Sequence, residues 1–70
     1  MIGFSRNLRH WREERGLRRA DLAALVGLSP ATIESYELEY RDPSMKSLTA
    51  LAKALDVEVA ALVTEGGEGA

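Results

Sequence analysis

The sequence predicts an all-α fold, a compact bundle of five short helices. Apolar residues recur at spacings of three and four, which is the period of an amphipathic helix. No segment alternates apolar and polar residues for long enough to form a β-strand. Glycine, serine and proline divide the helical pattern into short pieces, so we expect several short helices and no long one.

The first two helices are expected at residues 4–15 and 19–26. A glycine just past the last turn commonly ends a helix, and Gly16 and Gly27 occupy these two positions. The apolar stripe of the first helix consists of Phe4, Leu8 and Trp11. The stripe of the second helix consists of Leu22, Ala23 and Val26.

Three more helices are predicted downstream. Ser29 is an N-cap and Pro30 a first helical residue, so a third helix begins there and carries Ile33 and Tyr36. Ser44 caps a fourth helix, whose apolar residues are Leu48, Leu51, Ala52 and Leu55. A short fifth helix contains Val59, Leu62 and Val63. Residues 1–63 are expected to form one domain, and residues 64–70 a disordered tail because they lack large apolar side chains.

Charge is distributed unevenly along the chain. The net charge of the 70 residues is −2 and the isoelectric point is near 5.3, which argues mildly against a nucleic-acid partner. Residues 1–19, however, contain six arginines and only two acidic residues. This uneven distribution of charge indicates a basic face that binds a polyanion and an acidic face elsewhere. The alternative is that the arginines only keep an exposed helix face in contact with water.

Several classes of protein are disfavoured by composition. There is no cysteine and only one histidine, His10, so we expect neither a disulfide nor a metal site. We expect no cofactor and no enzymatic role, because a chain of this length hardly provides a catalytic cleft. The apolar runs are too short to cross a membrane and the N-terminus lacks a signal peptide, so a soluble cytoplasmic protein is expected.

The unit that points to function is residues 19–38, a short helix, a three-residue turn and a second helix. A glycine entering the turn and an apolar residue within it let two helices cross steeply while sharing one core. The second helix then protrudes, and a helix fits the major groove of double-stranded DNA with its first residues at the base edges.

The ordered motifs resemble the lambda-repressor-like helix-turn-helix family, the Cro or xenobiotic-response-element class of prokaryotic transcriptional regulators. The resemblance covers residues 4 to about 63 and rests on the segments 8–17, 21–23, 27–33, 36–37, 41–44 and 48–57. It implies a DNA-binding transcriptional regulator, with repression the favoured role. It also implies an ion pair between Arg12 and Glu37, which we expect to be structural and to set the third helix indirectly.

The resemblance implies which residues contact DNA. The candidates for base contacts are Pro30, Ala31, Thr32, Glu34 and Ser35. None is an arginine, lysine, asparagine or glutamine, the strongest base readers, so DNA shape is expected to contribute to specificity. Glu34 either accepts a hydrogen bond from cytosine or lies back along the helix surface. The candidates for phosphate contacts are Arg18, Arg19, Tyr40, Arg41 and Lys46.

The sequence departs from the family at two places. Arg18 stands where a capping serine or threonine is usual, so the second helix loses its cap and gains a cation. Leu38-Glu39 replaces a frequent Asn-Gly after the third helix. Either Glu39 adopts a positive φ at a cost of about 1 kcal/mol, or the third helix runs longer.

A homodimer is expected, because one copy offers few contacts and paired third helices lie about 34 Å apart on DNA. The candidates for the dimer interface are Pro43, Met45, Val57, Val59 and Leu62, with Leu38 and Tyr40 as additions. The alternative is a protein-interaction module on the same scaffold, such as an antitoxin or an assembly component, with a protein partner and weak or no DNA binding. The acidic balance, Glu34 and the apolar Leu38 and Tyr40 favour this alternative.

Overall fold

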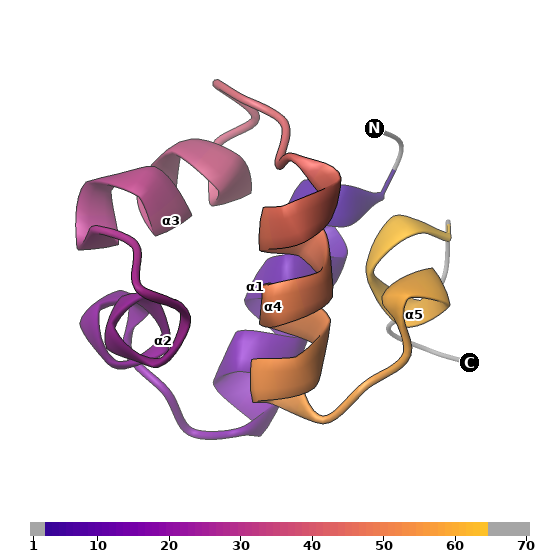
Figure 1. Cartoon of the computed structure of the whole chain (residues 1–70), viewed down its shortest axis with the longest axis horizontal. Helices are drawn as coiled ribbons and strands as arrows, with labels where there is room; N and C mark the ends of the chain where they lie inside the picture. Colours follow the sequence, from indigo (N-terminus) through magenta and orange to yellow (C-terminus); the bar gives the residue numbers. More distant parts are fainter. Residues whose placement is uncertain (1–2, 65–70) are drawn as a thin grey trace.

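A computed structural model describes residues 3–64, which form five helices in the predicted order. The helices are α1 (Phe4–Glu14), α2 (Arg19–Val26), α3 (Pro30–Glu37), α4 (Met45–Leu55) and α5 (Val59–Val63). Helix α3 packs against α1 and α2, and α5 packs against α1 and α4 (Figure 1). The all-α fold class is therefore confirmed. The predicted tail lies outside the described residues except for Thr64.

The helix ends follow the local signals in the sequence. Gly16 and Gly27 have φ angles of 68° and 70°, a left-handed conformation that glycine adopts without steric cost. The Oγ of Ser29 accepts the backbone N–H of Thr32 at 3.1 Å, and the Oγ of Ser44 accepts that of Ser47 at 3.1 Å. Each cap of this kind stabilises its helix by about 1 kcal/mol. The predicted starts of α3 and α4 are thus confirmed.

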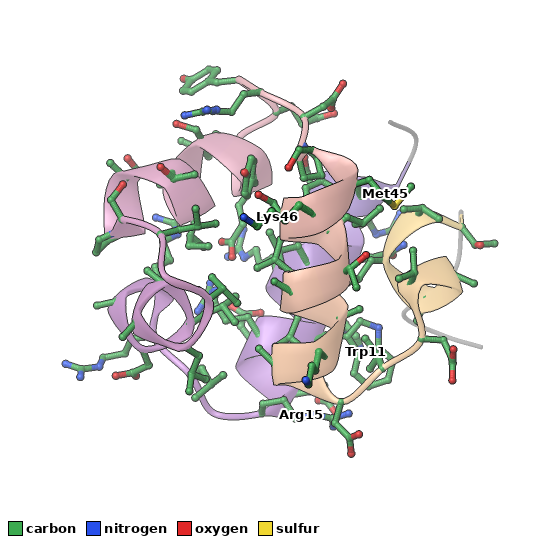
Figure 2. The ribbon with its side chains drawn as sticks, in the orientation of Figure 1. Trp11, Arg15, Met45 and Lys46 are labelled. Carbon is green, nitrogen blue, oxygen red and sulfur yellow. The ribbon has the colours of Figure 1, made fainter. Side chains whose placement is uncertain are left out.

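The C-terminus of α4 is capped by the side chain of Arg15, the residue that follows α1. Nε of Arg15 donates to the carbonyl oxygen of Leu55 at 2.8 Å, and its guanidinium lies 5.0 Å from the centre of the Trp11 ring. Figure 2 shows Arg15 at the last turn of α4. The cation satisfies a terminal carbonyl and faces the negative end of the helix dipole. Arg15 therefore ties the first helix to the fourth.

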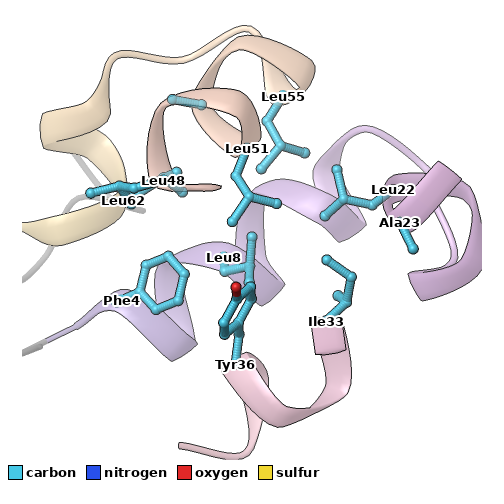
Figure 3. Close-up of a cluster of buried hydrophobic side chains, with 11 residues drawn as sticks. Phe4, Leu8, Leu22, Ala23, Ile33, Tyr36, Leu48, Leu51, Leu55 and Leu62 are labelled. Carbon is cyan, nitrogen blue, oxygen red and sulfur yellow. The ribbon is translucent and has the colours of Figure 1, made fainter. Parts of the chain in front are cut away.

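One apolar core joins all five helices (Figure 3). Its buried residues are Phe4, Leu8, Leu22, Ala23, Ile33, Tyr36, Leu48, Leu51, Ala52, Leu55 and Leu62. The rings of Phe4 and Tyr36 meet edge to face at 5.7 Å, a favoured aromatic geometry that fixes α3 on α1. Trp11 and Val26 pack against this core while partly exposed.

The structure contradicts one prediction made from the sequence and decides between two alternatives for the end of α3. Leu62 is fully buried in the monomer core, so its assignment to the dimer interface is wrong. An amphipathic pattern marks a residue that avoids water, and it does not reveal which partner covers it. Helix α3 does not run longer, because Glu39 adopts a φ of 64° just beyond its end.

Within residues 3–64, no helix has the length and apolar character needed to span a membrane.

Candidate functional site

Helices α2 and α3 pack against each other across the turn Gly27-Leu28-Ser29. The backbone N–H of Leu28 donates to the carbonyl oxygen of Ala23 at 2.9 Å, and its side chain packs against the core. These contacts fix the direction in which the chain enters α3. In Figure 1, α2 and α3 lie on one side of the molecule and α5 on the other.

The outer face of α3 carries short and acidic side chains. Pro30, Ala31 and Glu34 are exposed, whereas Thr32 and Ser35 are half-buried. The hydroxyl groups already have partners, because Oγ of Ser35 donates to the Ala31 carbonyl at 2.9 Å and Thr32 shares a 2.9 Å hydrogen bond with Ser29. The structure therefore brings all five candidate base-contact residues onto the first turns of one helix.

The expected ion pair between Arg12 and Glu37 is present. Nε and Nη2 of Arg12 donate to the two carboxylate oxygens of Glu37 at 2.6 and 3.1 Å, and Nη1 donates to the carbonyl oxygen of Leu17 at 2.8 Å. The Glu37 side chain is 1% exposed and the Arg12 side chain 11% exposed. The hydrogen bond to Glu37 raises the pKa of Arg12, although burial opposes the rise. The pair joins α1 to the last turn of α3.

Arg19 extends this ion pair toward the surface. Its Nε donates to Oε1 of Glu37 at 3.1 Å, and its Nη1 donates to Oε2 of Glu34 at 3.2 Å. We call Arg12, Glu37, Arg19 and Glu34 the α3 ion network. Its exposure increases outward, from the buried Glu37 to 35% for the Arg19 side chain and 53% for that of Glu34. Sequence reasoning missed the bonds of Arg19, because its partners lie 15 and 18 residues away.

The N-terminus of α2 is organised by Asp21 in place of the missing cap. Oδ2 of Asp21 accepts the backbone N–H of Arg18 at 2.8 Å and Nε of Arg18 at 3.0 Å. The side-chain hydrogen bond from Arg18 lowers the pKa of Asp21 to about 2, with the backbone N–H as a further cause. The Arg18 side chain remains largely exposed, so its cation is both paired and accessible.

The other candidate phosphate contacts lie in the segment after α3 and in the first turn of α4. Tyr40 is 78% exposed, and its backbone N–H donates to the carbonyl oxygen of Ser35 at 2.8 Å. The guanidinium of Arg41 lies 5.9 Å from the centre of the Tyr36 ring, which orients it by a cation–π contact. Lys46 is exposed in the first turn of α4, on the side that faces α3 (Figure 2).

The remaining candidates for a dimer interface lie elsewhere. Met45 is exposed at the side of α4 that faces α5 (Figure 2). Pro43, Val57 and Val59 are half-buried. Leu62 is buried in the core of the monomer. Lys46 and Met45, adjacent in sequence, therefore point to different surfaces.

No group of three potential metal ligands occurs among residues 3–64. The arrangement offers exposed cations around the outer face of α3, and its chemistry suits non-covalent binding of an anionic surface.

Two of the comparisons with known proteins agree with this geometry. A family model described as helix-turn-helix matches residues 8–62, a segment that contains α2, the turn and α3. The structure of this chain is similar to that of the P22 c2 repressor protein, crystallised in complex with a synthetic operator. The TM-score is 0.85 and the sequence identity is 28%. The similarity covers 91% of this chain and 97% of that chain. A search of curated proteins found no match.

Proposed function

The chain belongs to the lambda-repressor-like helix-turn-helix family, and on this premise we propose that it is a DNA-binding transcriptional regulator of the repressor type. Helix α3 enters the major groove of double-stranded DNA. The observation that carries the proposal is the likeness, over nearly the whole chain, to a repressor whose crystal structure contains a synthetic operator. A DNA partner agrees with the cytoplasmic location and the non-enzymatic role that the sequence predicts.

The DNA contacts follow from the exposed groups around α3. Ala31 and the methyl group of Thr32 meet thymine methyl groups, while Pro30 and Ser35 complete the surface that faces the bases. Since none of these side chains forms a bidentate contact with a base, the sequence-dependent shape of the DNA supplies much of the specificity.

Phosphates are bound by cations that flank α3 on both sides. Arg18 and Arg19 lie at the N-terminus of α2, whose helix dipole also favours an anion. Tyr40 and Arg41 follow the last turn of α3, with which they make a hydrogen bond and a cation–π contact, and Lys46 lies on the side of α4 that faces α3 (Figure 2). Each phosphate neutralised by a cation releases counterions, so binding weakens as salt rises.

The regulator acts as a homodimer. Pro43, Met45, Val57 and Val59 form the surface between the two copies, and the exposed Leu38 and Tyr40 extend it. Burial of the exposed Met45 favours this arrangement, because a large apolar side chain gains most from leaving water. Two copies of α3 then read a two-fold symmetric site.

The test is selection of bound sequences from a pool of random duplex DNA at two salt concentrations. We expect enrichment of a symmetric site and weaker retention at the higher salt concentration. Lys46→Ala should lower the slope of log affinity against log salt by about 0.9, the value for one phosphate. Lys53→Ala is the matched control, because Lys53 is also exposed on α4 but lies two turns away.

A second function is favoured by one observation, the exposure of Leu38 and Tyr40 beside α3. Contact with a protein partner would bury these apolar side chains and remove them from water. The selection experiment decides between the two functions. If duplex DNA does not retain the protein even at low salt, the DNA-binding proposal is wrong, and binding of a protein partner at Leu38 and Tyr40 is the function to test next.

A further inference from the structure

Glu34 occupies an unfavourable place for a protein that binds DNA. It is an exposed carboxylate on the helix that faces the major groove, where the phosphates on both sides repel it. In the structure its Oε2 is bound by Nη1 of Arg19 at 3.2 Å. Its neighbour one turn later, Glu37, is bound by Nε of the same arginine at 3.1 Å.

We propose that Glu34 is a positioning residue for Arg19 and not a base reader. The inference rests on the proposed function and assigns a role within it. Two carboxylates from successive turns of α3 hold the guanidinium of Arg19 at two of its three nitrogens. Among the residues that the structure describes, the third nitrogen, Nη2, has no hydrogen-bond acceptor. Its two N–H groups, together with the second N–H of Nη1, remain for a phosphate.

The buried end of the α3 ion network makes this arrangement rigid. Glu37 is 1% exposed and is already held by two nitrogens of Arg12, Nε and Nη2. Arg19 is therefore anchored at Nε to a group that cannot move, and Glu34 sets the rotation of the guanidinium about that anchor. A long side chain that is ordered before binding loses less conformational entropy when a phosphate arrives.

The same geometry argues against Glu34 as a competitor for the phosphate. Nη2 is still available while Nε and Nη1 are occupied, so a phosphate can bind without displacing either carboxylate. Oε1 of Glu34 keeps its capacity to accept from cytosine, so base reading is the outcome that the experiment below must separate from positioning. The network contains two arginines and two glutamates, so the charge of Glu34 is compensated where DNA approaches.

The test compares Glu34→Ala, Glu34→Gln and Glu39→Gln in the full chain, with a short duplex of random sequence as the probe. Glu34→Ala should weaken binding about two- to tenfold, the cost of ordering one side chain, although it removes a negative charge. Its salt slope should fall by up to about 0.9, because the contact of one phosphate is lost or loosened. The effect should vanish in an Arg19→Gln background.

Two variants serve as controls. Glu34→Gln keeps an oxygen that accepts from Nη1 of Arg19, so it should retain the slope and affinity of the wild type or bind more tightly. Glu39→Gln removes the same charge from a residue just beyond α3 that has no ion pair among the described residues. It should also bind at least as tightly as the wild type. Thermal unfolding verifies that each variant is folded.

Four results overturn the proposal. If the Glu34→Ala variant binds as tightly as the wild type, Glu34 does not position Arg19. If it binds more tightly, Glu34 competes with the phosphate. A loss confined to the selected operator and absent on random duplex makes it a base reader. A loss that persists with Arg19→Gln shows that Glu34 acts by another route. A wild-type protein that binds no duplex at low salt refutes the proposed function itself, which is a different outcome.

Discussion

Replacing Glu37 with glutamine is expected to lower the free energy of unfolding by about 3–5 kcal/mol, the cost of removing one partner from a buried ion pair. The carboxylate of Glu37 accepts three N–H groups, two from Arg12 and one from Arg19. A glutamine offers one oxygen and turns an NH₂ group toward a guanidinium. Arg12, whose side chain is 11% exposed, is then left without a counter-charge.

The loss is large relative to the stability of so small a domain. At roughly 0.05–0.15 kcal/mol per residue, the wild type has a total of about 4–10 kcal/mol. In a domain of this size each kcal/mol shifts the melting temperature by about 4–8 °C, so a fall of at least about 12 °C is expected. Urea unfolding followed by fluorescence of Trp11, the single tryptophan, measures the change.

Two further variants determine whether the mechanism is right. Glu13→Gln removes the glutamate of the exposed pair with Arg9 and should cost less than about 1 kcal/mol. The double variant Arg12→Met with Glu37→Leu removes both buried charges, so it should be more stable than Glu37→Gln alone. If Glu37→Gln cost no more than Glu13→Gln, the pair would be solvated and its structural role refuted.

Three further changes test the helix ends and the core. Arg18 lowers the pKa of Asp21 from 3.8 to about 2, so the wild type should have a higher free energy of unfolding than Asp21→Asn. This difference should be complete above pH 3.8 and should disappear as pH falls through about 2. A difference that grows in acid would contradict the assignment. Glu39→Gly should raise stability in urea by about 0.5–1 kcal/mol, because glycine relieves the positive φ; a decrease would mean that the glutamate side chain contributes more than the strain costs. Leu51→Ala should cost about 2–5 kcal/mol, whereas the exposed Leu25→Ala should stay within about 0.5 kcal/mol; equal urea midpoints would refute the core assignment.

Features set by neighbouring residues could be predicted from the sequence. Ser29 and Ser44 cap the helices that they precede, because the N–H groups they accept belong to residues three positions later. Gly16 and Gly27 end helices because the conformation required there is steric and local. The periodic apolar residues predict α1 to α5 for the same reason, since side chains three and four apart share a helix face.

Features set by tertiary packing could not be predicted in the same way. Arg15 caps α4 from 40 residues away, and Arg19 bonds Glu34 across the α2–α3 interface. In the sequence these are ordinary charged residues, and many pairings of nine cations with eleven acids are conceivable. The Arg12–Glu37 pair was expected only because the family resemblance supplied it. Leu62 was assigned wrongly, because a core and an interface bury apolar side chains alike.

The α3 ion network links the stability of the fold to the orientation of its recognition surface. Arg12 belongs to α1, Arg19 to α2, and both carboxylates to α3, so the network fixes α3 against two other helices at once. A weaker DNA affinity after replacement of Glu37 therefore mixes loss of folded protein with misorientation of α3. Glu34 lies at the exposed end of the same network, where its removal strands no buried charge. Variants at Glu34 can thus separate positioning from folding, and variants at Glu37 cannot.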